Sequence, residues 1–253
     1  MHTKEEYIGV FDSGVGGISV LRELMRFMPQ EKYLYFGDSA NAPYGKRSAE
    51  EVKQLTLNAA EMLFARGCKA LVVACNTATA AAIDTLRETY PDAIIIGIEP
   101  ALKVAADRFP GGNIGVMATP VTLQEEKFNN QLERFPGVTV HTIPVPDLVA
   151  LVEQGHTDDE AVENLLRPVL TPYANKLDAV VLGCTHYPFA AKAISKLLGE
   201  NTAVLDGGAG TARETRRRLM QEGLLHEGEG SLQIENSTHD PHKIALCMAL
   251  LER

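Results

Sequence analysis

The fold of this chain is decided by two similar stretches, Val72–Ile83 (VVACNTATAAAI) and Val180–Ile194 (VVLGCTHYPFAAKAI). Each begins with an apolar run, passes through a short polar turn that contains one cysteine, and continues as a helix pattern. Apolar runs without polar alternation are typical of strands buried on both faces, as in parallel sheets covered by helices. The two stretches therefore predict an α/β protein whose halves resemble a duplication.

The same unit of apolar run, polar turn and helix pattern recurs along the rest of the chain. Examples of the apolar runs are Tyr7–Phe11, Lys32–Phe36 and Asn113–Ala118, and one helix pattern extends from Pro120 to about Arg134. We predict two doubly wound α/β domains with parallel sheets, related by a pseudo-twofold axis. Because ligands of such sheets bind beyond the carboxyl ends of the strands, we expect the active site in the cleft between the domains.

Charge and hydropathy exclude several classes of function. The 253 residues carry a formal net charge of −9, which argues against general binding to nucleic acid. The basic run Arg213 to Arg218 is interrupted by Glu214, which is typical of a solvated helix face. The chain begins without a signal-peptide pattern, and no apolar stretch approaches the roughly 20 residues that span a membrane. We expect a cytoplasmic protein that does not bind membranes.

The four cysteines fall into two groups. They form no CxxC pair and no close cluster with histidines, so we expect no metal site. Cys68 lies between a helix pattern and a strand, and Cys247 lies in an apolar helix pattern, so both are interpreted as packing residues. Cys75 and Cys184 each follow a strand and precede a helix, the second helix being predicted from Pro188. The positive end of a helix dipole favours the thiolate form there.

Two further positions are candidates for chemistry. Asp12 and Ser13 begin a glycine-rich turn after the first strand, and such turns can bind anions through backbone N–H groups. The turn is not a dinucleotide fingerprint, because Ser19 stands where that pattern needs glycine. The alternative is a tight strand-to-helix turn capped by Ser13. His186 can serve as the proton partner of the nearby thiol, or alternatively as a helix cap.

This set of residues suits the inversion of a carbon that carries an acidic proton. One thiolate removes the proton from one face, and the other thiol donates a proton to the opposite face. The developing carbanion needs hydrogen-bond donors in a site that excludes water. The hydroxyl groups expected at strand-to-helix turns are those of Ser13, Thr77, Thr119, Thr122 and Thr185. No lysine stands out as a Schiff-base residue for pyridoxal phosphate, although the sequence alone does not exclude one.

Five segments closely resemble the glutamate racemases, in order and with similar spacing. They are FDSGVGG (11–17), FGDSANAPYG (36–45), VVACNTATA (72–80), GVMATPVT (115–122) and VVLGCTHYP (180–188). The resemblance implies a cofactor-independent enzyme that interconverts L- and D-glutamate and supplies D-glutamate for peptidoglycan. It also implies a homodimer, and two facing domains that contribute one catalytic cysteine each. The expected domains are residues 1–98 with 209–253, and residues 99–208.

The resemblance assigns a role to each matching residue. Cys75 and Cys184 become the two acid/base groups, Asp12 and His186 their auxiliary partners, and Glu153 a further acidic helper. Contacts to the amino and α-carboxylate groups of glutamate are expected from Asp12, Ser13, Asn76, Thr77, Thr119, Thr122 and Thr185. The side-chain carboxylate end is expected to be lined by Pro43, Tyr44 and Gly45.

The chain also departs from the family pattern, and other functions remain open. Leu123-Gln124 follows Thr122 where the family usually has a serine, and Glu235–His242 is unlike the family. One alternative is a related two-cysteine enzyme, such as an aspartate or hydantoin racemase, a maleate isomerase or a decarboxylase. Another is a binding protein that restrains a partner such as DNA gyrase. The turn at Pro43 to Gly45 and the pair Asn76-Thr77 favour glutamate.

Overall fold

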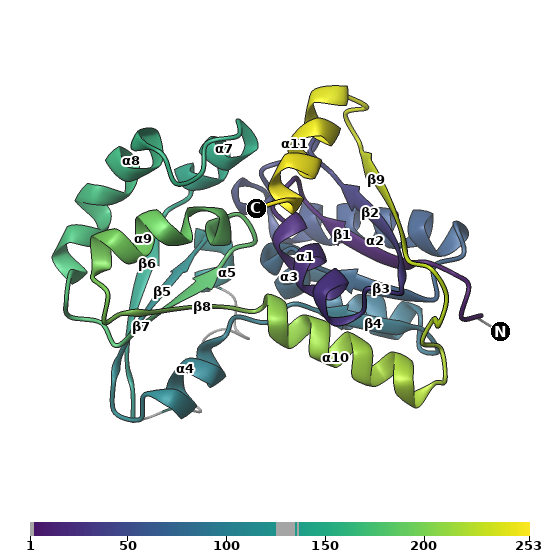
Figure 1. Ribbon diagram of the computed structural model, residues 1–253, viewed down its shortest axis with the longest axis horizontal. Helices are drawn as coiled ribbons and strands as arrows, with labels where there is room; N and C mark the ends of the chain where they lie inside the picture. The colour runs from purple at the N-terminus through teal and green to yellow at the C-terminus, as the bar shows by residue number, and fades with distance from the viewer. Residues whose placement is uncertain (1–2, 125–134, 136) are drawn as a thin grey trace. The chain divides into compact units, whose positions relative to one another are not determined.

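The computed structural model describes residues 3–124, 135 and 137–253, and it divides into two compact units (Figure 1). Unit 1 consists of Met1–Glu99 and Gly208–Arg253, and unit 2 is Pro100–Gly207. The chain thus leaves unit 1 once and returns to complete it. Each unit has its own parallel sheet, and the prediction of two α/β domains with parallel sheets is confirmed.

Unit 1 contains a five-stranded parallel sheet with the order β4-β3-β1-β2-β9. Its strands are β1 (Ile8–Asp12), β2 (Lys32–Gly37), β3 (Ala70–Val73), β4 (Ile94–Gly97) and β9 (Ser231–Asn236). Strand β1 pairs with β2 on one side and with β3 on the other. The connections after β1 and β2 therefore lead to opposite sides of β1, so the strand order reverses between β1 and β3. In open α/β sheets, ligands bind at the carboxyl ends of the strands beside such a reversal.

The helices of unit 1 cover its sheet in two groups. Their bounds are α1 (Ile18–Phe27), α2 (Ala49–Ala65), α3 (Asn76–Thr89), α10 (Gly208–Gln221) and α11 (Pro241–Leu251), with the 3₁₀ helix η1 at Tyr44–Lys46. Helix α1 packs against α10 and α11, and α2 packs against α3. Every residue of β1 and β3 is buried, as the apolar runs predict for strands covered on both faces.

Unit 2 repeats this topology with four parallel strands in the order β6-β5-β7-β8. The strands are β5 (Asn113–Ala118), β6 (Thr139–Pro144), β7 (Ala179–Gly183) and β8 (Ala203–Asp206). The helices are α4 (Leu102–Arg108), α5 (Pro120–Gln124), α7 (Asp147–Glu153), α8 (Glu160–Leu170) and α9 (Ala191–Leu198), with 3₁₀ helices η2 (Thr171–Tyr173) and η3 (Tyr187–Ala190). Here the order reverses between β5 and β7. The expected continuation of α5 to about Arg134 lies outside the described residues.

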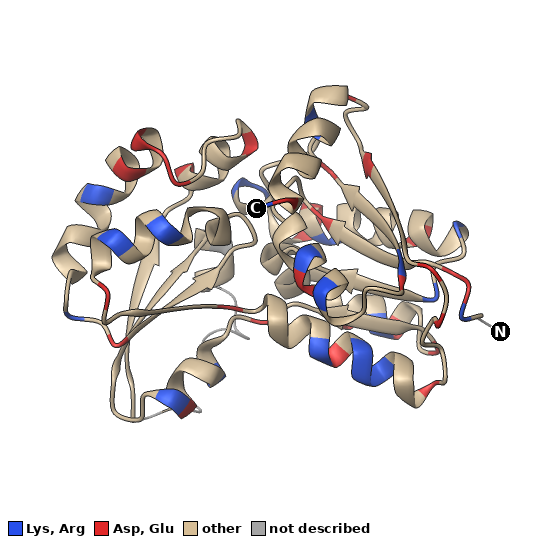
Figure 2. Cartoon of the chain, viewed as in Figure 1, with Lys and Arg blue, Asp and Glu red and all other residues tan. Residues whose placement is uncertain are grey.

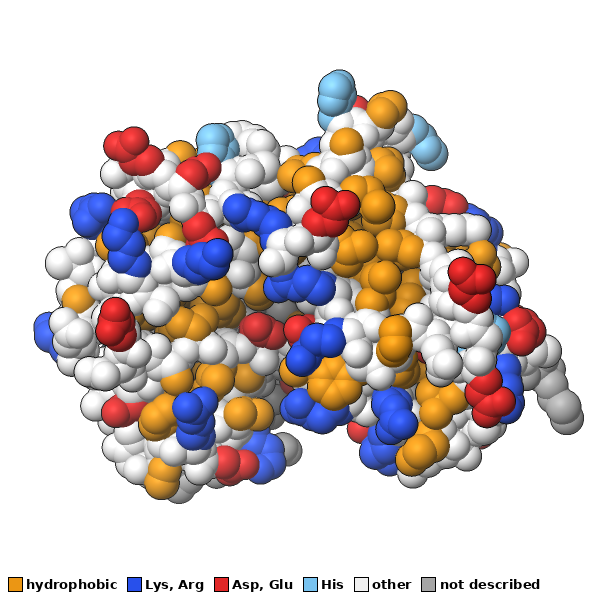
Figure 3. Space-filling view, viewed as in Figure 1, with side chains coloured by type: hydrophobic (Ala, Val, Ile, Leu, Met, Phe, Trp, Pro, Cys, Tyr) orange, Lys and Arg blue, Asp and Glu red, His pale blue; other side chains and the backbone are white. Residues whose placement is uncertain are grey.

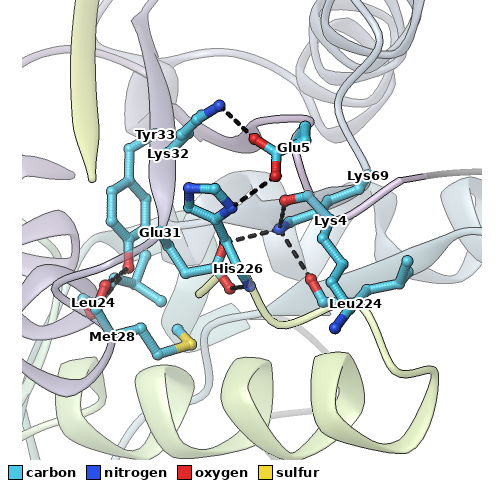
Figure 4. A network of polar contacts seen from close by, with 10 residues as sticks. All are labelled: Lys4, Glu5, Leu24, Met28, Glu31, Lys32, Tyr33, Lys69, Leu224 and His226. Atoms are coloured by element: carbon cyan, nitrogen blue, oxygen red, sulfur yellow. Dashed lines mark hydrogen bonds and ion pairs between the residues drawn. The ribbon is translucent and has the colours of Figure 1, made fainter. Parts of the chain in front are cut away.

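A buried ion pair fastens the returning chain to unit 1 (Figure 4). The Nζ atom of Lys69 lies 2.7 Å from Oε2 of Glu31, and neither side chain is more than 2% exposed. The same ammonium donates to the carbonyl oxygens of Lys4 and Leu224 at 2.8 and 2.9 Å. The other carboxylate oxygen of Glu31 accepts from the backbone N–H of His226 at 2.9 Å. The pair therefore joins β3, the loop before β2, the N-terminal segment and the segment after α10.

The surface mixes both signs of charge. Figure 2 shows several basic residues on α10, and one of them, Arg217, forms two hydrogen bonds with Glu214 at 2.6 and 2.7 Å. This pairing is what a solvated helix face would show. On the face seen in Figure 3, hydrophobic side chains gather near α11 and β9, and Met248 of α11 is 44% exposed. Among the described residues, no helix has the length and hydropathy needed to cross a membrane.

Candidate active site

Cys75 lies where the strand order of unit 1 reverses. It follows β3 and is the N-cap residue of α3, and its Sγ accepts a hydrogen bond from the backbone N–H of Ala78 at 3.4 Å. Its thiol is also 3.5 Å from Oγ of Ser13, to which it can donate. An N–H donor and the positive end of a 14-residue helix both favour negative charge on sulfur. The predicted position of Cys75 at a helix N-terminus is therefore what the structure shows.

Asp12 ends the neighbouring strand β1 and is completely buried. Its Oδ1 accepts from the backbone N–H of Gly14 at 2.9 Å, which fixes the carboxylate at the start of the glycine-rich turn. A Cβ atom on Gly17 would lie 2.5 Å from Cβ of Asp12. The backbone of the turn can therefore come this close to Asp12 only because residue 17 is glycine. Asp12, Ser13 and Cys75 thus belong to one half-site in unit 1.

Asn76 is the most informative residue of this half-site. It is only 6% exposed, and neither Oδ1 nor Nδ2 of its amide has a hydrogen-bond partner among the described residues. A buried polar group without a partner costs free energy, roughly 1–3 kcal/mol. A buried amide beside a thiol, with a free donor and a free acceptor, is well suited to bind a polar ligand. Thr77, the next residue, is also buried.

Tyr44 completes the half-site from the loop after β2. It is buried, and its hydroxyl donates to Oδ2 of Asp38 at 2.7 Å. Burial raises its pKa far above the ordinary value, and the negative charges of Asp38, Cys75 and Asp12 add to that effect. Tyr44 therefore stays protonated, within electrostatic reach of the thiol and of Asp12. Its neighbours in the turn, Pro43 and Gly45, are exposed and half-buried.

Cys184 lies at the corresponding position of unit 2, after β7 and beside the reversal of strand order. Pro188 lies in the first turn of the helical segment that ends at Leu198, as predicted, but this first turn is the 3₁₀ helix η3, and α9 begins at Ala191. Proline lacks an N–H donor and fits the first turn of η3, but a 3₁₀ helix of four residues has little dipole. Cys184 thus lacks the α-helix N-terminus that Cys75 has.

A histidine and a carboxylate stand beside Cys184 instead. Nδ1 of His186 is 3.7 Å from Sγ of Cys184, and Nε2 is 2.9 Å from Oε1 of Glu153. Burial alone would lower the pKa of His186, but hydrogen bonds with Cys184 and Glu153, and their charges, hold it well above the ordinary value. The imidazolium form is therefore favoured at neutral pH, and it can stabilise a thiolate at Cys184.

The Glu153→Gln variant tests this chain of contacts. Because the carboxylate raises the pKa of His186, its removal should lower that pKa, and the imidazolium should be lost at a lower pH. The titration of His186 followed by NMR measures the change directly. Glu163→Gln is the control, since Glu163 pairs with Lys196 on the surface of the same unit. An unchanged His186 titration in Glu153→Gln would show that Glu153 does not hold this proton.

Three buried threonines lie at the turns that follow β5 and β7 in unit 2. Thr119 follows β5 at the reversal of strand order, and its Oγ1 is 3.1 Å from Oγ1 of Thr122. Thr122 also donates its backbone N–H to Oγ1 of Thr119 at 3.4 Å. Thr185 stands between Cys184 and His186 and is 3% exposed. The structure therefore brings Thr119 and Thr122 into contact just after β5, the strand that pairs with β7, and Cys184 follows β7.

The structure shows two supporting residues for which the sequence predicts no role. Tyr187 is fully buried and donates its hydroxyl to the carbonyl oxygen of Val145 at 2.7 Å, next to the start of α7, which carries Glu153. Asp38 follows β2, beside Asp12 at the end of β1, and its carboxylate accepts from Tyr44 and Asn41. A carboxylate in the polar turn after the predicted strand Lys32–Phe36 is the sequence signal that marks Asp38. For Tyr187 the partner is 42 residues away, and no local signal exists.

Comparison with known proteins identifies the family. The sequence profile of the Asp/Glu/Hydantoin racemase family matches residues 9–215. The chain belongs to this family. A glutamate racemase from Clostridium kluyveri is 48% identical, with both chains covered completely. The crystal structure of a glutamate racemase from Bacillus anthracis is 33% identical, covers 99% of this chain and 95% of its own, and has a TM-score of 0.89.

A further racemase structure, that of glutamate racemase from Francisella tularensis in complex with D-glutamate, is 26% identical and has a TM-score of 0.85. It covers 99% of this chain and 95% of its own. The resemblance to the glutamate racemases predicted from five segments is thus confirmed, and so is the prediction that this chain is an enzyme of the racemase class. The roles of the individual site residues stay predictions.

Proposed function

We propose that this racemase interconverts L- and D-glutamate without a cofactor, using Cys75 and Cys184 as the two acid/base groups. One observation carries the proposal: each unit places one buried cysteine after the strand where its sheet reverses order. The glutamate racemases of Clostridium kluyveri and Francisella tularensis support glutamate as the substrate.

The reaction needs one proton removed and one proton added at the same carbon. The thiolate of one cysteine takes the α-proton from one face of glutamate and becomes a thiol. The thiol of the other cysteine gives its proton to the opposite face of the carbanion and becomes a thiolate. In the reverse direction the roles exchange, so the enzyme ends each turnover with the proton on the other sulfur. Atoms and charge balance without an oxidant or a reductant.

The two thiols are supported in different ways. Cys75 has the N–H of Ala78 and the N-terminus of α3, which stabilise negative charge without moving a proton. Cys184 has His186 and, behind it, Glu153. We propose that His186 stabilises the thiolate of Cys184, and that Asp12, buried beside Ser13, has the auxiliary role in unit 1. A thiol is far more acidic than the α-carbon, so the donors around the carbanion must supply much of the stabilisation.

Binding of an anionic amino acid by a chain of net charge −9 requires local donors. We propose that the free amide of Asn76, the hydroxyls of Ser13 and Thr77, and those of Thr119, Thr122 and Thr185 bind the amino and α-carboxylate groups. The turn of Pro43, Tyr44 and Gly45 would then line the side-chain carboxylate. Hydroxyls and amides add no charge, so the acidic surface need not contribute to binding.

Three further proposals concern the setting of the enzyme. Its D-glutamate would be used for peptidoglycan, it would act in the cytoplasm, and it would form a homodimer. The hydrophobic side chains near α11 and β9 in Figure 3 are a surface that a second copy could cover. Sedimentation of the purified protein at several concentrations measures the oligomeric state.

The direct test of the function is racemisation by the purified chain with no cofactor added. We expect loss of optical rotation from L-glutamate and from D-glutamate, each approaching a racemic mixture. Aspartate, which is one methylene shorter, is the comparison substrate. Turnover of aspartate without turnover of glutamate would contradict the proposal and favour another member of the family.

A further inference from the structure

Asp38 stands at the carboxyl end of β2, next to the half-site of unit 1. Its backbone N–H donates to the carbonyl oxygen of Asp12 at 2.9 Å, so the two aspartates leave neighbouring strands side by side. The side chain is 5% exposed. A buried carboxylate is stable only when donors satisfy it, and an aspartate in this position requires an explanation.

Two donor groups of the loop that follows Asp38 hydrogen-bond to its carboxylate. The hydroxyl of Tyr44 donates to Oδ2 at 2.7 Å, and Nδ2 of Asn41 is 3.1 Å from each carboxylate oxygen. The backbone N–H of Asn41 donates in turn to the carbonyl oxygen of Asp38 at 3.1 Å. Asp38 therefore stabilises the conformation of this loop and holds the hydroxyl of Tyr44 next to the end of β2.

The direction of the Tyr44 hydrogen bond is fixed. The phenol is buried among negative groups, so it keeps its proton, and a carboxylate can only accept. The ring of Tyr44 packs at 6.2 Å from that of Phe11, which anchors it to β1. Hydrogen bonds to a charged acceptor are about twice as strong as neutral ones. Loss of the charge on Asp38 should therefore release the turn without unfolding the sheet.

The last residue of β9 and the residue that follows it contact the same loop. Nδ2 of Asn236 donates to Oγ of Ser39 at 2.8 Å, and the backbone N–H of Ala40 donates to Oγ of Ser237 at 2.9 Å. Asn236 and Ser237 belong to the stretch Glu235–His242, which departs from the family pattern. These two contacts lie on the first part of the loop, whereas the side chain of Asp38 contacts the hydroxyl of Tyr44.

We propose that Asp38 is a positioning residue that holds the turn of Pro43, Tyr44 and Gly45, and so determines how well the enzyme binds the side-chain carboxylate of its substrate. The inference rests on the proposed function, which assigns that carboxylate to this turn. Asp38 does not touch the reacting atoms. It acts through Tyr44, and its loss should affect binding of the distal carboxylate and leave proton transfer at the α-carbon nearly unchanged.

The test compares Asp38→Asn, Tyr44→Phe and the double variant. We expect each single variant to raise KM for glutamate about tenfold and to change kcat by less than about threefold. The double variant should be no worse than the more impaired single variant, because Tyr44→Phe removes the same hydrogen bond that Asp38→Asn weakens. The inhibition constant of 2-aminobutyrate, which lacks the side-chain carboxylate, should stay the same in all three. Asn41→Ala removes only the amide contacts and should give a smaller rise in KM.

Tyr33→Phe is the matched control. Tyr33 lies on the same strand β2, is 1% exposed, and donates its hydroxyl to the carbonyl oxygens of Leu24 and Met28. It should lose stability but keep KM. Two results with a wild type that racemises glutamate would overturn the inference. One is a wild-type KM for glutamate in Asp38→Asn. The other is a loss of affinity for 2-aminobutyrate in Asp38→Asn that is as large as its loss of affinity for glutamate. If Asp38→Asn does not fold, the inference is still overturned when Tyr44→Phe and Asn41→Ala both keep the wild-type KM for glutamate. A wild type inactive on glutamate overturns the proposed function, and the inference with it.

Discussion

Cys75→Ser and Cys184→Ser should each lower the rate of racemisation by about 10³-fold or more, in both directions. Loss of a general acid or base typically costs about 10²–10⁴-fold, and each direction of this reaction needs both sulfurs. Serine keeps the size and the hydrogen-bonding pattern, but its hydroxyl is a far weaker acid than a thiol. The measurement is the rate of change of optical rotation from each enantiomer at saturating substrate.

The chain provides its own controls for these variants. Cys68 and Cys247 are both fully buried, and burial raises the pKa of Cys68 to about 11, so it stays a neutral thiol. Cys68→Ser and Cys247→Ser should keep near-wild-type kcat, with a lower unfolding midpoint because a hydroxyl replaces a buried thiol. If the variants of Cys75 and Cys184 retained comparable rates to these two, the two-thiol mechanism would be wrong.

The single variants should also differ from each other. With one sulfur removed, the other can still exchange the α-proton of the enantiomer that it faces, although it cannot complete the inversion. We expect Cys75→Ser and Cys184→Ser to exchange the α-hydrogen of opposite enantiomers with solvent. Exchange of the same enantiomer by both variants would place both cysteines on one face of the substrate.

Lys69→Met should strongly destabilise the fold, although Lys69 lies outside the candidate active site. The ammonium of Lys69 is completely buried and meets a carboxylate and two carbonyl oxygens. Its removal leaves Glu31 buried without a counter-charge, which costs roughly 3–5 kcal/mol in the free energy of unfolding. Urea unfolding measures the loss, and hydrogen exchange at the amide of His226 should show that the returning segment is released.

Two variants make this prediction specific. The double variant Lys69→Met with Glu31→Leu removes both charges and should recover most of the stability, since apolar replacements of buried pairs are often neutral. Lys32→Met removes an ion pair with Glu5 whose side chains are 26% and 69% exposed, and should cost less than about 1 kcal/mol. A loss for Lys69→Met no larger than that for Lys32→Met would show that the buried pair does not fasten the chain.

The strands and the positions of the two cysteines could be predicted from the sequence, because both depend on patterns within a few neighbouring residues. The apolar runs before Cys75 and Cys184 are continuous, as is typical of strands covered on both faces, and both strands are fully buried. The type of helix that begins after Cys184 could not be predicted from the sequence in the same way. A proline at position 188 fits the first turn of a 3₁₀ helix as well as that of an α-helix, and packing decides between them.

Contacts between distant residues account for what the sequence does not reveal. The carbonyl oxygens that accept from Lys69 are 65 and 155 residues away along the chain. In a single sequence Lys69 resembles any surface lysine before a strand. The unpaired amide of Asn76 is likewise visible only when its surroundings are known. The different support of the two thiols, by a helix N-terminus at Cys75 and by His186 at Cys184, emerges from geometry rather than from pattern.

The position of deuterium after turnover in D₂O tests the two-thiol proposal most directly. L-glutamate and D-glutamate are each incubated with the enzyme, and the α-hydrogen of substrate and product is followed by NMR at low conversion. Our account predicts deuterium in the product enantiomer and almost none in the recovered substrate, because one thiol removes the proton and the other delivers a solvent-derived one. Product that keeps its original α-hydrogen, or substrate labelled as fast as product, would contradict it.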